Sequence, residues 1–421
     1  MRFEKWQRNL TALWIAQTLN MVAFSFVIPF FPLYVQTLGV QGAAEVAQWA
    51  GILAAAPSLS LAISQPIWGS LADRFGRRPM VIRSMFGGGV VVGLMGFVSS
   101  PEQLLVLRLI QGLVTGTVAA CNALVASTTP KAHLGVALGI MQVAIFLGMS
   151  IGPLIGGIFA DTYGFRITFY VACILMLLGA LIAAVFVEEQ FTPPSRGVQR
   201  PSIWRDSRTL LSTAIFPILL GVTFLIQFGQ SIVAPMLSLF IEELSGGVNA
   251  ATMAGVTLAG TGVTSAISAL ALGRLGDRIG HTKILTVCLA GATITFFPQA
   301  MVQDVFQLVI LRSLLGFFLG GLMPTANALI AQASPDARRG SAFGLSSAST
   351  SLAHGAGPLM GAGVATHWGL RAVFLATSIL FAIAYIWTSH GFRKYPLSRA
   401  KPEILRPSTR ARPASQSKND S

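Results

Sequence analysis

Twelve long apolar runs alternate with short polar segments along the 421 residues. About 20 residues of helix cross a hydrocarbon core roughly 30 Å thick, so runs of this length predict transmembrane helices. The predicted spans are 10–37, 47–72, 80–99, 102–127, 134–160, 166–187, 210–241, 250–273, 282–302, 304–332, 340–366 and 370–391. The pattern therefore predicts an all-α polytopic membrane protein with twelve transmembrane helices.

A polar stretch in the middle of the chain divides these spans into six and six. We expect an N-terminal six-helix bundle over 1–187, a cytoplasmic linker over 188–209 and a C-terminal six-helix bundle over 210–391. The linker contains three prolines and four arginines, which suits an exposed connection. The remaining residues, 392–421, are rich in Arg, Pro and Ser and predict a basic, disordered cytoplasmic tail.

Composition and charge support a membrane location. Hydrophobic residues make up 53% of the chain and charged residues 10%, against roughly 25% charge in soluble domains. If the N-terminus is cytoplasmic, 25 of the 29 Lys and Arg residues fall on the cytoplasmic side. That bias follows the positive-inside rule and predicts both termini in the cytoplasm of a bacterial inner membrane. It also explains the net charge of +14 without nucleic-acid binding.

Several motifs occur twice at nearly one spacing. A charged turn between two apolar runs, 69–79, recurs 204 residues later at 273–283, and Arg108–Gly116 recurs as Arg312–Gly320. Gly152-Pro153 recurs as Gly357-Pro358. The residues that we expect to form a conformational-switch motif are Gly69, Asp73, Arg74, Gly76, Arg77 and Arg78 in the first copy and Gly273, Asp277 and Arg278 in the second. We interpret this as a parallel duplication of six-helix halves, typical of a rocking transporter.

Three of these stretches, 69–79, 108–116 and 148–157, resemble in order and position the signature motifs of the major facilitator superfamily. The third resembles the antiporter motif of its twelve-span drug:proton antiporter branch, and the chain looks similar to bacterial multidrug exporters. The resemblance implies export of small amphiphilic compounds by alternating access, with proton exchange. It implies that Asp73 latches the outward-open state. It also implies that the helix with Gly148, Gly152, Pro153, Gly156 and Gly157 seals the path between the halves.

The candidates for proton coupling are Arg108, Gln111 and His354. Arg108 lies roughly 10 Å from the outer face, with Gln111 on the same helical face. It is either a structural brace bonded to carbonyls or, as the resemblance implies, part of proton coupling. Arg312 has Leu315 in place of the glutamine, and we expect it to be a brace. His354 is the other proton-coupling candidate, with a neutral, structural histidine as the alternative.

All fifteen acidic residues fall in loops, tails or helix ends. A proton-coupled exporter of cations often carries a mid-membrane carboxylate, so this chain departs from that pattern. A cavity of amides and arginines favours neutral or anionic amphiphiles. Polar or aromatic residues expected to line it, each alternatively a contact between helices, are Gln17, Asn20, Phe24, Asn122, Gln142, Gln227, Gln230 and Asn327.

The alternatives are an exporter dedicated to one metabolite or siderophore, a uniport facilitator and a membrane-embedded enzyme. Residues 148–152 satisfy the G-x-S-x-G hydrolase pattern, but that pattern needs a strand before the serine, and here the flanks form one apolar helix. We therefore expect no enzyme, no cofactor and no metal. The expected partners are a small-molecule substrate, protons and the lipid bilayer, and the expected state is a monomer.

Overall fold

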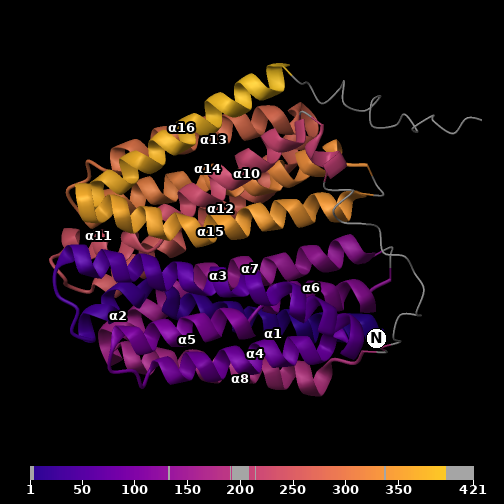
Figure 1. Cartoon of the computed structure of the whole chain (residues 1–421), viewed down its shortest axis with the longest axis horizontal. Coiled ribbons are helices and arrows are strands. Elements are labelled where there is room, and N and C mark those ends of the chain that lie inside the picture. The colour runs from indigo at the N-terminus through magenta and orange to yellow at the C-terminus, as the bar shows by residue number, and fades with distance from the viewer. Residues whose placement is uncertain are drawn as a thin grey trace, which may run out of the picture.

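The computed structural model describes residues 4–130, 133–189, 191, 208–213, 215–335 and 338–394, without the side chain of Asp73. Most of the predicted linker and the predicted tail from residue 395 onward lie outside the described residues. Within them the chain is helical, and the helices run roughly parallel to one long axis (Figure 1).

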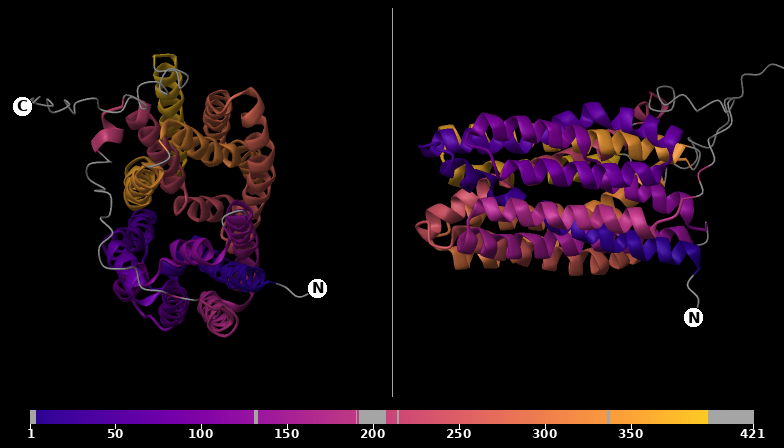
Figure 2. Two further views of the ribbon diagram at one scale, coloured as in Figure 1. Left: turned by 90° about the vertical axis from the view of Figure 1, so that its right-hand side faces the viewer. Right: turned by 90° about the horizontal axis from the view of Figure 1, so that it is seen from below.

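The first half contains α1 (Lys5–Val27), η1 (Ile28–Phe30), α2 (Phe31–Thr37), α3 (Ala43–Phe75), α4 (Arg77–Met95), α5 (Pro101–Val114), α6 (Thr117–Thr128), α7 (Leu134–Tyr163) and α8 (Phe165–Phe186). The second half contains α10 (Ile215–Val233), α11 (Met236–Ser245), α12 (Ala250–Ile279), α13 (His281–Gln299), α14 (Val305–Ala333), α15 (Arg339–Trp368) and α16 (Leu370–Lys394). Two bundles result, drawn in indigo to magenta and in salmon to yellow (Figures 1 and 2).

Three predicted spans are broken into two helices, and glycine or proline explains each break. Pro29 lies in η1 between α1 and α2, and Pro235 separates α10 from α11. Proline has no backbone N–H to donate, so it interrupts a helix interior. Gly116 separates α5 from α6 at φ +117°, a left-handed conformation that favours glycine. When each broken pair is counted as one span, the helices of the described residues correspond to the twelve predicted spans.

Nine of these spans, within the described ranges, are long and apolar enough to cross a membrane by length and hydropathy alone. The others are α4, α13 and α15. Two arginines, Arg77 and Arg78, open α4, and α15 is rich in Ser and Gly. Both helices pack against neighbours of their own bundle or of the other one. The arginines of α4 and the Ser and Gly residues of α15 account for the lower mean hydropathy of these two helices.

The duplication read from the sequence is also a duplication of packing. In the first half Gly152 lies on Ser25 of α1, where an added Cβ would be 2.0 Å from the serine Oγ. In the second half Gly357 lies on Ser231 of α10, where an added Cβ would be 2.6 Å from the serine Cβ. Each of these glycines lets two helices approach closely, which is how transmembrane helices commonly associate.

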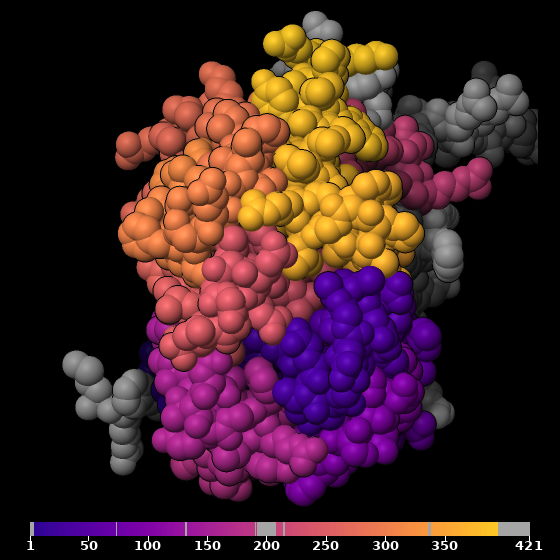
Figure 3. Space-filling view, turned by 90° about the vertical axis from the view of Figure 1, so that its left-hand side faces the viewer, coloured from indigo at the N-terminus to yellow at the C-terminus, as the bar shows by residue number. Residues whose placement is uncertain are grey.

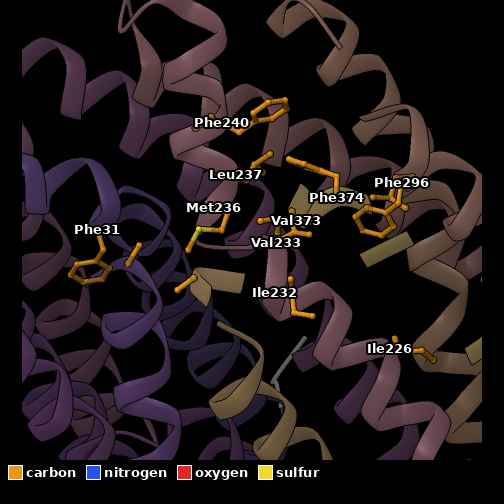
Figure 4. Packing of buried hydrophobic residues seen from close by; sticks show 14 of the residues in the cluster. Phe31, Ile226, Ile232, Val233, Met236, Leu237, Phe240, Phe296, Val373 and Phe374 are labelled. Atoms are coloured by element: carbon orange, nitrogen blue, oxygen red, sulfur yellow. The ribbon is translucent and has the colours of Figure 1, made fainter. Parts of the chain in front are cut away.

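Aromatic pairs repeat in the same way. Tyr34 of α2 packs on Phe169 of α8 with ring centroids 4.8 Å apart, and Phe240 of α11 packs on Phe374 of α16 at the same 4.8 Å. Figure 4 shows Phe240 and Phe374 in one cluster with Phe31 of the first half at its edge. The buried apolar cluster is therefore continuous between the bundles at the end formed by α2 and α11.

Candidate functional site

The two halves meet along two helix pairs, α3 with α15 and α7 with α12. At Gly51 of α3 an added Cβ would lie 2.5 Å from the Cβ of Ala362. At Gly157 of α7 it would lie 2.3 Å from the carbonyl oxygen of Ala251. Backbones this close leave no room for a molecule between them.

Hydrogen bonds reinforce the contact at the same end of the molecule. Gln36 Nε2 donates to Glu242 Oε2 at 2.7 Å, and Ser238 Oγ donates to the carbonyl of Pro29 at 2.7 Å. The backbone N–H of Thr252 donates to Asp161 Oδ2 at 2.7 Å. Figure 3 views this end, and atoms of the two halves meet across the face. We call it the closed end.

The same four helices separate toward the other end of the molecule. An added Cβ would meet nothing within 4 Å at four glycines there, Gly69, Gly139, Gly273 and Gly344, one on each helix. Ile63 of α3 is 71% exposed and Leu270 of α12 is 68% exposed. We call this the open end. Contact at one end and separation at the other is the geometry of a carrier in one of its alternating states.

The glycines of the expected sealing helix have two different neighbours. Gly148, Gly152 and Gly156 pack on Met21, Ser25 and Phe26 of α1, inside the first half. Pro153 faces Gly255 of α12, and Gly157 faces Ala251 of the same helix. The structure therefore places Pro153 and Gly157 at the boundary between the halves, and the other three glycines between α7 and α1.

The charged turn of the predicted switch motif is a single glycine between two helices. Gly76 joins α3 to α4 at φ +95°, and its counterpart Gly280 joins α12 to α13 at φ +101°. Only glycine adopts such angles without strain. Asp73 lies in the last turn of α3, but its side chain is outside the described residues, so its latching role stays a prediction. Asp277, its counterpart, contacts His281 at 3.2 Å.

Glu189 caps the helix that follows this turn, a contact that the sequence did not indicate. Its carboxylate accepts hydrogen bonds from the backbone N–H of Arg77, at 2.9 Å, and of Arg78, at 2.8 Å. A carboxylate at a helix N-terminus is favoured by the unpaired N–H groups and the helix dipole. Glu189 lies 112 residues further along the chain than Arg77, so no local spacing could have indicated the contact.

A cavity of about 380 Å³ lies beside this cap, lined among others by Lys5, Trp6 and Phe191. All of its lining residues belong to the first half or to the segment directly after it. It is therefore not the space between the halves.

Arg108 is buried, 2% exposed, and held by three groups. Its Nε donates to the carbonyl of Leu53 at 2.8 Å, its Nη1 donates to Gln111 Oε1 at 2.6 Å, and its guanidinium lies 4.4 Å from the ring centroid of Phe31. The carbonyl of Leu53 is available because the residue four positions on, Pro57, has no N–H for it. Arg108 therefore joins α5 to a proline-interrupted part of α3.

His354 of α15 forms a polar network with α10. Its Nδ1 lies 2.9 Å from Ser231 Oγ and its Nε2 lies 3.2 Å from Gln227 Nε2. Ser231 Oγ donates its proton to the carbonyl of Gln227 at 2.7 Å, so it accepts from His354. The assigned tautomer is thus Nδ1–H, with Nε2 accepting from the Gln227 amide. Gln230 Nε2 completes the chain by donating to Gln227 Oε1 at 3.2 Å.

The network lies next to the boundary between the halves. Gly355, the neighbour of His354, packs on Leu59 of the first half, where an added Cβ would be 2.8 Å from the leucine Cδ2. His354 itself is exposed. The predicted residues His354, Gln227 and Gln230 are therefore brought together, and Ser231, which was not predicted, joins them. No charge or motif distinguishes Ser231 from the other serines of the sequence.

The other predicted cavity residues are scattered. Gln17 and Asn20 are buried, 1% and 2% exposed, and both polar atoms of the Gln17 amide lack a partner. Phe24 and Gln142 are exposed, whereas Asn122 and Asn327 are half-buried. In the part of the chain that the structure describes, no group of three or more His, Cys, Asp or Glu could hold a metal ion.

Two six-helix halves related by duplication, joined at one end and separated at the other, define a membrane transporter rather than an enzyme. The comparisons with known proteins give its family. The model of the Major Facilitator Superfamily matches residues 13–221 and again 219–417, close to the two halves. The chain belongs to the Major Facilitator Superfamily, and the predicted fold is confirmed.

Curated relatives are similar over nearly the whole chain. The "Multidrug resistance protein MdtG" of Escherichia fergusonii is 38% identical over 397 residues, which is 93% of this chain and 96% of the relative. The protein of that name from Escherichia coli K12 is 38% identical over 395 residues, again 93% and 96%. A solved bacterial homologue of the human lysosomal transporter Spinster, inward-facing and unoccupied, has a TM-score of 0.76 at 16% identity, covering 94% of this chain and 98% of that one.

Proposed function

We propose that this protein is a monomeric drug exporter of the bacterial inner membrane that moves small amphiphilic compounds out of the cytoplasm in exchange for protons. The observation that carries the proposal is the contact of the halves at one end and their separation at the other, along the same four helices. The class of substrate follows from the relatives, which are named as multidrug resistance proteins and align with 93% of this chain.

The open end is the cytoplasmic end in this proposal. Basic residues at that end include Arg8 of α1, Arg74 of α3, Arg274 of α12 and Lys283 of α13. The positive-inside rule assigns such a cluster to the cytoplasm. The described conformation is then inward-open, with halves at 1–187 and 210–391, a linker at 188–209 and both termini inside.

His354 is the site of proton binding in this proposal. A proton would bind at Nε2, which in the neutral ring accepts from the amide NH₂ of Gln227. A protonated ring donates from both nitrogens, so the Gln227 amide must turn and present its oxygen to Nε2. That oxygen is then lost to the Gln230 amide, which has to find another acceptor. Proton uptake therefore changes the polar groups that α10 offers beside the boundary between the halves.

Arg108 and Gln111 hold α3 and α5 together while the half moves as a body, because all their described bonds stay inside the first half. The amides Asn122, Asn327 and Gln142 have no hydrogen bond to other described residues and are accessible to a ligand. A cavity of this kind, without a deep carboxylate, suits neutral or anionic amphiphiles. A dedicated metabolite exporter and a uniport facilitator are the remaining candidates.

The test uses inverted membrane vesicles with a preformed proton gradient and a pH-sensitive dye, to which neutral, cationic and anionic amphiphiles are added. We expect a neutral or anionic compound to release protons from wild-type vesicles. The His354→Gln variant should still equilibrate that labelled compound but release no protons. His390→Gln, the same change at an exposed histidine of α16, is the matched control and should behave as wild type.

If His354→Gln couples as well as wild type, the histidine is not the proton site. If no compound releases protons from wild-type vesicles while the labelled compound still equilibrates, exchange with protons is wrong and the facilitator takes its place.

A further inference from the structure

Arg312 of α14 occupies the position that Arg108 occupies in the first half, 204 residues earlier. It is also buried, 6% exposed. Arg108 has three neighbours that stabilise its charge, namely the carbonyl of Leu53, the amide of Gln111 and the ring of Phe31. The duplication allows each neighbour to be compared with its counterpart.

The carbonyl that corresponds to that of Leu53 is not free in the second half. The counterpart of Pro57 is Thr261, and the counterpart of Leu53 is Thr257, both within α12. Thr261 has the backbone N–H that proline lacks, so the helix can satisfy the carbonyl of Thr257. The hydroxyl of Thr261 donates to that same carbonyl at 2.8 Å. The carbonyl of Thr257 is therefore not free for a guanidinium.

The other two neighbours have become leucines. The counterpart of Gln111 is Leu315, and Phe31 aligns with Leu237 when Val27 and Pro29 are placed on the valine and proline 206 residues later. Leu315 is 0% and Leu237 is 1% exposed. The second half therefore keeps the arginine and replaces the groups around it with apolar side chains.

Arg312 is left without a partner among the described residues. Its Nε is fully buried with no hydrogen bond, and no ion pair joins its guanidinium to another described residue. The brace that the sequence predicted has nothing to bond to. Asp304, at the start of α14, is eight residues away, about 12 Å along the helix axis. A buried, unpaired cation is strongly destabilising and attracts an anion.

We propose that Arg312 is a subsite for the acidic group of the exported molecule, and that the molecule is an amphiphilic carboxylate. A guanidinium donates two parallel hydrogen bonds to one carboxylate, which fits an arginine with no other acceptor. The leucines that replace Gln111 and Phe31 provide no acceptor, so the acceptor for Arg312 has to come from the bound molecule. This inference rests on the proposed export function and specifies the charge of its substrate.

The experiment measures binding to the full-length protein in lipid nanodiscs. The probes are a dansyl-labelled fatty acid and the primary amide of the same labelled chain, which differ only in the charge of the head group. Binding to wild type is compared with Arg312→Gln, Arg312→Lys and Leu315→Gln. The last variant gives Arg312 the internal acceptor that Arg108 has in Gln111, three residues further along the helix.

We expect wild type to prefer the acid over the amide by roughly tenfold to a hundredfold, as a charge-assisted pair in a buried site allows. Arg312→Gln should abolish the preference and leave the affinity for the amide unchanged, which also reports that the variant is folded. Leu315→Gln should reduce the preference although no charge is removed, and Arg312→Lys should retain part of it.

The proposal is overturned if wild type shows no preference, or if Arg312→Gln keeps it. It is also overturned if Arg312→Gln binds neither probe while Leu315→Gln binds both as wild type does, because the arginine then has a structural role only. Failure of the proposed export function looks different. In that case wild type binds the acid through Arg312, but vesicles carrying it move neither probe.

Discussion

The bond between Arg108 and the carbonyl of Leu53 exists because Pro57 cannot supply the N–H that the helix would otherwise use. The predicted perturbation is therefore a double-mutant cycle of Arg108→Leu and Pro57→Ala. Alone, Arg108→Leu leaves the buried carbonyl of Leu53 and the amide oxygen of Gln111 without a donor. When Pro57→Ala is also present, the backbone N–H of the introduced alanine replaces the guanidinium at the carbonyl.

The magnitudes follow from the contacts that are lost. A buried acceptor left unpaired costs about 1–3 kcal/mol, and Arg108→Leu leaves two of them. The stacking on Phe31, at 4.4 Å, adds about 0.5–2 kcal/mol. Arg108→Leu should thus lower the free energy of unfolding by about 2.5–8 kcal/mol. The Pro57→Ala background should recover about 1–3 kcal/mol of it, since only one of the two acceptors is rescued.

The assay is denaturant unfolding in mixed micelles, followed with a thiol-reactive fluorescent dye. Cys121 and Cys288 are 0% and 1% exposed, so they react only when the protein opens. The reasoning is refuted if Arg108→Leu costs the same free energy with proline and with alanine at position 57. That result would mean that the guanidinium does not replace the missing N–H.

Two further predictions test the contacts at each end of the molecule. A Cβ added at Gly157 would lie 2.3 Å from the carbonyl oxygen of Ala251, so Gly157→Val should hold the halves apart and abolish transport in the vesicle assay. Gly139→Val, on the same helix but in open space, is the control and should transport normally. Loss of transport in both variants would point to helix propensity instead. Glu189→Ala removes the cap of α4 and should lower the free energy of unfolding by about 0.5–2 kcal/mol. The control is Glu243→Ala at an exposed position, which should leave the free energy of unfolding unchanged. Equal effects of the two variants would argue against the cap.

Sequence alone was sufficient for the architecture, because each helix must satisfy its own backbone in lipid and bury a span of fixed length. Apolar run length therefore predicts the spans without knowledge of any contact. The repeats of Gly76 and Gly152 likewise predicted two related halves, since close turns and close helix contacts admit only glycine.

Side-chain partners could be decided only by the tertiary structure. The sequence placed Gln111 three residues from Arg108, a local relation, but the carbonyl of Leu53 is 55 residues away and Glu189 is 112 residues from the helix that it caps. From the sequence, the buried amides Gln17 and Asn20 of α1 could not be told apart from Gln227 and Gln230, which lie beside His354. The contacts of an amide depend on its position in the bundle, which the residue type does not reveal.

The two buried arginines show most clearly what the sequence predicts and what only the tertiary structure decides. Sequence showed Arg108 and Arg312 as one motif repeated, and the loss of the glutamine as a single difference. Their environments differ because a proline in a neighbouring helix exposes a carbonyl to the first and a threonine withholds it from the second. Whether a buried charge is satisfied depends on which helices pack around it, and that packing is decided by the fold of the whole chain.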